Sequence, residues 1–217
     1  MQLTDHHTTY LSRDTWYQRA KLDDEFMNYL WKQIDIAKKD NNSANHYLAG
    51  NISKSLGLKD QDNHLINTAL KSFHEMNKDS IDDEISQSLK SFSKKIIPTR
   101  PEILNLWVNF QKKHEFNPIH NHSGVLSFVI WMDIPYTWAD EKELDFVKHS
   151  NTTQDVGNFV FCYATGRRIL TEVVRMKPDI SGYMLLFPSW LDHIVYPFYT
   201  SDKERISISG NIGFIPC

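Results

Sequence analysis

Residues Arg205–Ile212 read RISISGNI, and polar and apolar side chains alternate along this stretch. Neighbouring residues of a strand point to opposite faces, so a period of two predicts a β-strand with one polar and one apolar face. The apolar face carries isoleucines at positions 206, 208 and 212, which predicts a packed core against it. The polar face carries Arg205, Ser207, Ser209 and Asn211, whereas strands that face solvent usually carry Lys, Glu or Thr. We therefore expect the polar face to line a ligand cavity, with a solvent-facing surface as the alternative.

Six further runs of apolar, β-branched and aromatic residues lie upstream and are separated by turn residues. They are Leu104–Phe110, Leu126–Asp133, Asn158–Ala164, Ile169–Met176, Tyr183–Pro188 and His193–Phe198. Seven short strands at this spacing predict a β-sandwich or an open barrel. The prolines at positions 98 and 101 interrupt any preceding helix, so we place the start of this strand-rich core at residue 98.

Residues 1–97 are predicted to be a helical region. Apolar residues follow a 3.6-residue period from Leu22 to about Lys39, from Asp62 to Met76 and from Ile81 to Ile96. Ser80 is expected to cap the third helix, because an acidic residue follows it three positions later. The helices should pack on one sheet of the core, which predicts an α+β, mainly β fold in which residues 1–97 and 98–217 form one structural domain.

Composition excludes several classes of protein. The 217 residues include 24 Lys and Arg and 27 Asp and Glu, a formal net charge of −3, which argues against a nucleic-acid partner. No apolar run reaches the length of a membrane span, and the N-terminus lacks the layout of a signal peptide. Cys162 and Cys217 form no disulfide framework. We therefore expect a cytoplasmic protein without membrane or nucleic-acid partners, whose oligomeric state the sequence does not indicate.

A histidine pair precedes the strand at Leu126. Residues i and i+2 of an extended segment point the same way, so His120 and His122 can bind one metal ion. His193 opens a later strand, and Arg205 follows it by 12 residues. Two ligands on an early strand and one on a late strand are typical of the facial triad of non-haem iron enzymes. Arg205 on the adjacent strand could bind a carboxylate in the same barrel.

Four motifs carry a family resemblance: NPIHNHSG at Asn117–Gly124, LSFVI at Leu126–Ile130, FPSWLDH at Phe187–His193 and RISISGN at Arg205–Asn211. Together they resemble the Fe(II)/2-oxoglutarate-dependent oxygenase superfamily, and more narrowly the prolyl-hydroxylase-like oxygenases encoded by phages and marine bacteria. The resemblance covers about residues 104–214. A phage-encoded member would act in the cytoplasm of its host.

The resemblance implies a double-stranded β-helix, also called a jelly roll. His120 and His193 would match the two histidine ligands of the family, and Arg205 with Ser207 would bind the distal carboxylate of 2-oxoglutarate. Asn109 and Asn211 are further candidates for the wall of the cosubstrate pocket. The implied reaction converts 2-oxoglutarate and O2 to succinate and CO2 while a C–H bond of a substrate is hydroxylated.

The sequence departs from the family at the third ligand, because His122 stands where the family pattern places Asp or Glu. Strand parity points Asp192 away from His193 and Asp133 away from His122, so we favour His120, His122 and His193 as three histidine ligands. Such a site has one negative charge fewer. In a second alignment with the family, His122-Ser123-Gly124 resembles the His-x-Gly of iron halogenases, in which the missing carboxylate leaves room for chloride. His120 would then support the ligands without binding the iron itself.

Two other functions stay open at this point. One is a cupin-like three-histidine metalloenzyme that does not use 2-oxoglutarate, which would need no buried carboxylate-binding arginine. The other is a non-catalytic β-barrel binding module, which would need no iron. The substrate, whether a small molecule or a peptidyl residue, is not indicated. The polar stretch Tyr136–Thr153 is expected to cover the mouth of the site.

Overall fold

The computed structural model describes residues 3–76, 78–90, 99–151 and 154–216. Its strands are β1 (Thr4–Tyr10), β2 (Trp16–Lys21), β3 (Ser55–Gly57), β4 (Thr99–Gln111), β5 (Asn117–His120), β6 (Leu126–Asp133), β7 (Phe159–Thr165), β8 (Arg168–Val174), β9 (Tyr183–Pro188), β10 (His193–Val195) and β11 (Arg205–Pro216). Its helices are α1 (Asp24–Asp40), α2 (Lys71–Met76), α3 (Lys78–Lys90) and α4 (Trp138–Glu141). Short helical turns lie at Asn45–Tyr47 (η1), Gln61–Asn63 (η2), Ile66–Leu70 (η3) and Pro178–Ile180 (η4).

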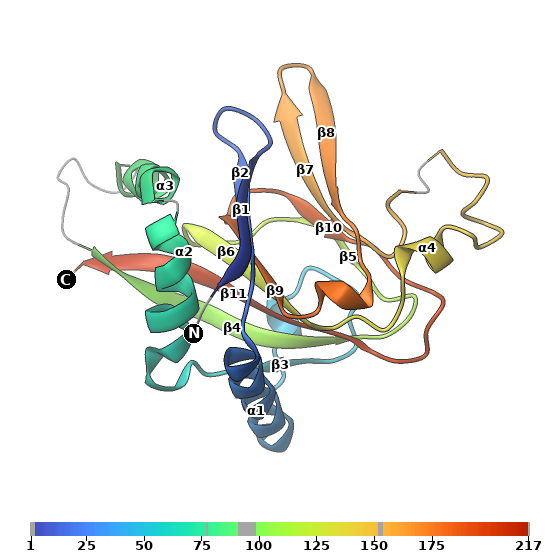
Figure 1. Cartoon of the computed structure of the whole chain (residues 1–217), viewed down its shortest axis with the longest axis horizontal. Coiled ribbons are helices and arrows are strands. Elements are labelled where there is room, and N and C mark those ends of the chain that lie inside the picture. Colours follow the sequence, from blue (N-terminus) through green and yellow to red (C-terminus); the bar gives the residue numbers. More distant parts are fainter. Residues whose placement is uncertain (1–2, 77, 91–98, 152–153, 217) are drawn as a thin grey trace.

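The strands form two antiparallel sheets (Figure 1). The larger sheet has the order β1-β2-β9-β6-β11-β4-β3, and the smaller sheet has the order β5-β10-β7-β8. Strands that are distant in sequence are neighbours in both sheets, as the crossovers of a jelly roll require. The predicted double-stranded β-helix with N-terminal helices on one sheet is therefore confirmed.

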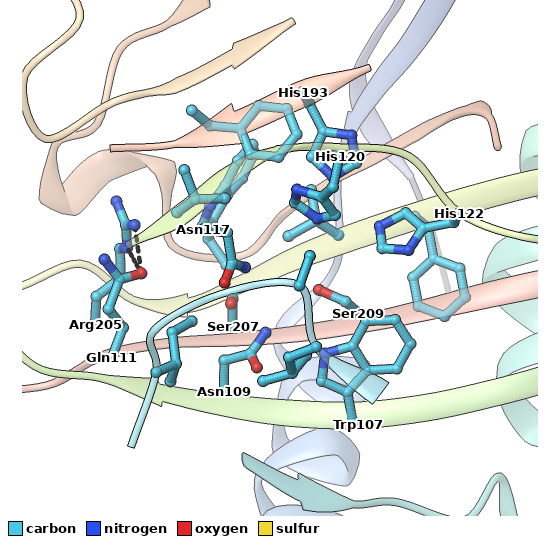
Figure 2. Close-up of a pocket in the computed structure, with 18 of the residues that line it drawn as sticks. Trp107, Asn109, Gln111, Asn117, His120, His122, His193, Arg205, Ser207 and Ser209 are labelled. Carbon is cyan, nitrogen blue, oxygen red and sulfur yellow. Dashed lines mark hydrogen bonds between the residues drawn. The ribbon is translucent and has the colours of Figure 1, made fainter. Parts of the chain in front are cut away.

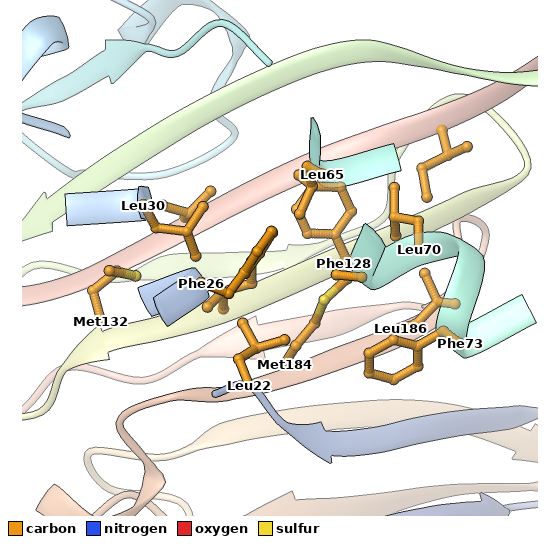
Figure 3. Close-up of a cluster of buried hydrophobic side chains, with 14 of the residues drawn as sticks. Leu22, Phe26, Leu30, Leu65, Leu70, Phe73, Phe128, Met132, Met184 and Leu186 are labelled. Carbon is orange, nitrogen blue, oxygen red and sulfur yellow. The ribbon is translucent and has the colours of Figure 1, made fainter. Parts of the chain in front are cut away.

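Helices cover the outer face of the larger sheet and bury an apolar cluster against it (Figure 3). Helix α1 begins at the N-cap Asp23, whose side chain accepts a hydrogen bond from the amide of Phe26 at 2.9 Å. Phe26, Leu30 and Ile34 follow the helical period, and all three are buried in this cluster. The helical region therefore serves as the outer layer of the barrel.

The larger sheet is buried on both faces at its centre, which explains why β6 reads as a continuous apolar run. Phe128, Ile130 and Met132 pack under the helices, whereas Val129 and Trp131 belong to a second cluster between the two sheets. Val129 and Trp131 also line a cavity between the sheets, so the cavity lies directly beside this second cluster.

Strand β11 has the two-faced character predicted from its alternation. Ile208 and Ile212 lie in the cluster under the helices, and Ser207 and Ser209 face the space between the sheets. Gly210 lies on the helix side, where a Cβ atom would stand 2.5 Å from Cζ of Phe128 and 2.9 Å from the carbonyl oxygen of Asn105. The glycine is therefore required by close packing within the sheet.

All seven predicted strands are present, but residues 1–97 are not purely helical. The hairpin β1–β2 joins the larger sheet through β9, and β3 forms its opposite edge. Ser80 lies inside α3, which begins at Lys78, so the prediction that Ser80 caps this helix is wrong. Phe92 and Ile96 of the predicted third helix lie outside the described residues. Among the described residues, no helix is long and apolar enough to cross a membrane.

Candidate metal centre

Two short strands of the smaller sheet bring the first two histidines together. His120 ends β5, His193 begins β10, and the antiparallel register pairs these two residues directly. Their ring centroids are 4.3 Å apart. His193 is only 3% exposed and stacks on Phe159 at a centroid distance of 5.1 Å. Neighbouring strands therefore fix both imidazoles at the end of the barrel interior.

His122 completes the cluster from the segment that follows β5. Its backbone amide donates a hydrogen bond of 2.9 Å to the carbonyl of Ser189, which ties this segment to the turn before β10. Its ring centroid lies 5.0 Å from those of both His120 and His193 (Figure 2). One nitrogen from each ring lies within 4.8 Å of the other two, so the three imidazoles can bind a single metal ion.

The histidines are prepared to act as neutral ligands. Nδ1 of His120 lies 2.7 Å from the carbonyl oxygen of Pro118, and Nδ1 of His193 lies 3.1 Å from that of Leu191. A carbonyl only accepts, so these bonds place the proton on Nδ1 and leave Nε2 free for a metal. Burial lowers the pKa of His120, holds that of His193 well below its usual range, and lowers the pKa of His122 to about 4. All three rings are therefore neutral at physiological pH.

No carboxylate of the described residues joins this cluster. Asp192 instead accepts a 2.8 Å hydrogen bond from Nδ2 of Asn121, and Asp133 is exposed at the end of β6. Gly124 adopts φ +99°, and a Cβ atom there would stand 2.7 Å from the carbonyl oxygen of Ile212. Its conformation and packing thus account for this glycine, which is not among the residues lining the cavity.

The three histidines border a cavity of about 80 Å³ between the sheets. Paired positions of β11 and β4 form its floor: Arg205 with Gln111, Ser207 with Asn109, and Ser209 with Trp107. Figure 2 shows the Arg205–Gln111 pair at one end and the histidines at the other, with Asn109, Asn117 and Ser207 between them. The predicted polar face of β11 therefore does line a cavity.

Arg205 is only 3% exposed, and all five of its N–H groups donate to protein oxygens. Nε and Nη2 donate to Oε1 of Gln111 at 3.2 and 2.5 Å, and Nη2 also donates to the carbonyl of Tyr196 at 3.3 Å. Nη1 donates to the hydroxyl of Tyr136 and to the carbonyl of Gly157. Burial raises the pKa of Tyr136 to about 12, so this phenol is neutral as well. Arg205 is thus a buried cation held only by neutral groups.

The remaining predicted residues lie in two different environments. Asn109 lines the cavity, and its Oδ1 accepts a 2.7 Å hydrogen bond from Ser55, which leaves its NH2 group free to donate. Asn211 is buried, but its Oδ1 accepts a hydrogen bond from Ser127 at 3.0 Å and it is not among the lining residues. Asn211 is therefore placed for structural hydrogen bonding within the sheet.

Sequence reasoning missed several residues of the cavity wall. Leu48, Ala49 and Ile52 border the cavity, whereas residues 136–151, the described part of the segment 136–153 expected to cover the mouth, contribute no lining residue. Gln111, Asn117 and Trp107 were not predicted as site residues either, although each lines the cavity. The inward-facing positions of β4, every second residue from Trp107 to Gln111, carried the signal for two of them.

Comparisons with known proteins agree with this geometry. Residues 105–211, about half of the chain, match the family model described as "Putative 2OG-Fe(II) oxygenase". No curated protein matches the sequence. The match includes the strands and turns that carry the three histidines and Arg205.

Solved structures with limited similarity include three oxygenases. A Pseudomonas putida prolyl-4-hydroxylase has 14% identity and a TM-score of 0.49, over 89% of this chain and 90% of that chain. A Trichoplax adhaerens prolyl hydroxylase, solved with a hypoxia inducible factor peptide fragment, has 14% identity and a TM-score of 0.46, over 92% of this chain and 83% of that chain. A 2OG-Fe(II) oxygenase family oxidoreductase from Burkholderia pseudomallei has 13% identity and a TM-score of 0.37, over 94% of this chain and 70% of that chain. From the family model, the chain belongs to the 2OG-Fe(II) oxygenase family and is an enzyme.

Proposed function

We propose that this enzyme is an Fe(II)/2-oxoglutarate-dependent hydroxylase whose iron is held by three histidines. Family membership implies the use of Fe(II) and 2-oxoglutarate. One observation carries the proposal: a single cavity has three neutral imidazoles at one end and, at the other, a buried arginine whose hydrogen-bond partners are all neutral. These two ends suit a metal ion and an anion respectively.

The residues present fit both groups. His120, His122 and His193 would each offer one ring nitrogen to the iron, and the backbone bonds of His120 and His193 leave Nε2 of these two rings without a proton. Arg205 forms no ion pair among the described residues, and a buried cation without an anion is unfavourable. A carboxylate of 2-oxoglutarate would supply the missing charge at Arg205, with Ser207 at the next inward position to donate a further hydrogen bond.

The protein contributes placement and exclusion of water. When bound, iron and 2-oxoglutarate would supply the activation of O2 that couples formation of succinate and CO2 to hydroxylation of a substrate C–H bond. The two ends of the cavity would fix the direction of the cosubstrate, with one carboxylate at Arg205 and the 2-oxo acid end toward the three histidines. The aromatic rings of Phe159 and Trp107 border the site and limit access of water to it.

The alternatives account for fewer of these features. A cupin-like enzyme that does not use 2-oxoglutarate would have no use for a buried Arg205 at the far end of the metal cavity. In the halogenase alignment His120 would not bind the iron itself, yet its ring is within 5.0 Å of both other histidines, and Gly124 does not line the cavity. Three histidine ligands therefore account better for the cluster.

The substrate and the location of the enzyme belong to the proposal as well. We expect a small molecule or a peptidyl residue as the substrate, the latter because of the prolyl-hydroxylase-like resemblance. The charge balance argues against a nucleic-acid partner, and the cysteine content favours activity in the cytoplasm.

Turnover of the cosubstrate tests the proposal. Purified enzyme with Fe(II), O2, 2-oxoglutarate and ascorbate, which supplies the two electrons that a substrate C–H bond would otherwise supply, should release succinate and CO2 in equal amounts, in excess over the enzyme, and a chelator should stop the reaction. His193→Ala and Arg205→Ala should both be inactive, whereas Arg167→Ala, a matched change in the exposed turn between β7 and β8, should keep full activity. Consumption of 2-oxoglutarate no faster than with Fe(II) in buffer alone would contradict the proposal.

A further inference from the structure

Gln111 occupies the face of Arg205 that looks into the cavity. The two residues are direct partners in the antiparallel pairing of β4 and β11, and both line the cavity. Tyr136, Gly157 and Tyr196, which accept the other N–H bonds of Arg205, are not among the lining residues. An anion that enters the cavity therefore meets the Nε and Nη2 edge of the guanidinium, where Gln111 is bound.

Gln111 occupies the edge of the guanidinium at which an arginine binds a carboxylate, with one oxygen in place of two. Oε1 of Gln111 accepts from Nε and from Nη2 at 3.2 and 2.5 Å, the two groups that an arginine presents side by side to a carboxylate. Its Nε2 group donates to the backbone carbonyl of Glu115, which orients the amide with its oxygen toward Arg205. Gln111 is only 2% exposed, so this arrangement lies in the interior of the protein.

We infer that Gln111 is a neutral stand-in for the cosubstrate carboxylate and sets the affinity of the enzyme for 2-oxoglutarate. The inference rests on the proposed function and names a determinant of its cosubstrate site. In the free enzyme the amide oxygen satisfies Arg205 without neutralising it. An incoming carboxylate displaces that oxygen, because a charged acceptor binds a guanidinium more strongly than a neutral one.

The choice of an amide over an acid has a direct consequence. A glutamate at position 111 would form a buried ion pair with Arg205 and remove the unpaired charge from the free protein. The free protein would become more stable, and the cosubstrate would lose its binding site. The native glutamine therefore makes the free protein less stable than a glutamate would, but it leaves Arg205 able to bind an anion. Both effects come from the amide group of this one side chain.

Two variants of similar size test the inference, because they should act in opposite directions. Gln111→Glu should raise the melting temperature of the metal-free protein by at least about 2–4 °C. It should also weaken the binding of 2-oxoglutarate by at least about 100-fold. Gln111→Met should lower the melting temperature, since two N–H groups of Arg205 lose their acceptor, and should bind 2-oxoglutarate at least as tightly as the parent. Calorimetric titration of the Fe(II)-loaded protein without O2 gives the affinities, and scanning calorimetry gives the melting temperatures.

A third variant separates the role of Gln111 from a general effect of negative charge. Asn109→Asp makes the same chemical change one inward position along β4, without a bond to Arg205, and should not raise the melting temperature. If both Gln111 variants lowered stability and 2-oxoglutarate affinity alike, Gln111 would be an ordinary structural residue and the inference would be wrong. If the parent enzyme itself bound no 2-oxoglutarate, the proposed function would fail instead, which the titration of the parent reveals.

Discussion

Metal affinity should be almost independent of pH between 7.5 and 6.0. A histidine binds metal only when its ring nitrogen is deprotonated, so protons compete with iron around the pKa of each ligand. Burial lowers the pKa of all three candidate ligands, to about 4 for His122 and well below the usual range for His193. Because a lowered pKa keeps the ring neutral at lower pH, competition at His122 and His193 should begin only well below pH 6.5.

The size of the effect follows from ordinary titration. A histidine with the usual pKa of about 6.5 is about 91% neutral at pH 7.5 and about 24% neutral at pH 6.0, a change of about fourfold. With three such ligands, the affinity for the metal would fall by about 50-fold between pH 7.5 and 6.0, and metal binding at pH 6.0 would release about 2.3 protons. With His122 and His193 neutral throughout, only His120 can contribute, so we expect a loss below about fourfold and release of less than about one proton.

Calorimetry measures both quantities. Titration with Fe(II) under argon at the two pH values gives the affinities, and repeating each titration in buffers of different ionisation enthalpy counts the protons released. A decrease near 50-fold with release of more than two protons would refute the view that burial keeps the three ligands neutral.

Three further predictions concern single residues. His193→Ala should abolish Fe(II) binding, because two imidazoles remain, and metal analysis after anaerobic reconstitution should find no bound iron. Arg205→Ala should bind Fe(II) normally but should bind 2-oxoglutarate at least about 100-fold more weakly in an anaerobic calorimetric titration. If the variant bound 2-oxoglutarate as tightly as the parent, Arg205 would not be part of the cosubstrate site. Gly210→Ala should lower the free energy of unfolding by about 1–3 kcal/mol, because its Cβ would stand 2.5 Å from Phe128, and an unchanged denaturant midpoint would show that the sheet adapts freely.

The central strands were predictable because burial on two faces leaves a strong local signal. The bounds of β6 and β9 agree with the apolar runs of the sequence, and the alternation in β11 identified the cavity side of that strand. The histidine pair was predictable for a similar reason, since His120 and His122 are two residues apart. His193 could be joined to them only through spacing and family resemblance, because the register of β5 and β10 is a tertiary feature.

The N-terminal hairpin escaped prediction because its outer strand is polar and its inner strand, WYQRAK, is short and does not alternate strictly. Strand β1 reads TDHHTTY and forms the edge of the larger sheet, where polar residues are favoured because they discourage aggregation. Gln111 was missed for a different reason. Its role depends on its pairing with Arg205, and the sequence does not give the register of β4 and β11. Asn211 has the right parity, but its hydrogen bond with Ser127 holds it in the sheet.

The most direct test of the account is a titration of the metal-free protein under argon, first with Fe(II) and then with 2-oxoglutarate, followed by visible absorption. We expect one equivalent of Fe(II) to bind and a weak metal-to-ligand charge-transfer band to develop as 2-oxoglutarate is added. Both the iron and the band should be absent in His193→Ala, and the band alone in Arg205→Ala. Binding of Fe(II) without that band would contradict the assignment of 2-oxoglutarate to this cavity, and failure to bind Fe(II) would contradict the three-histidine metal centre.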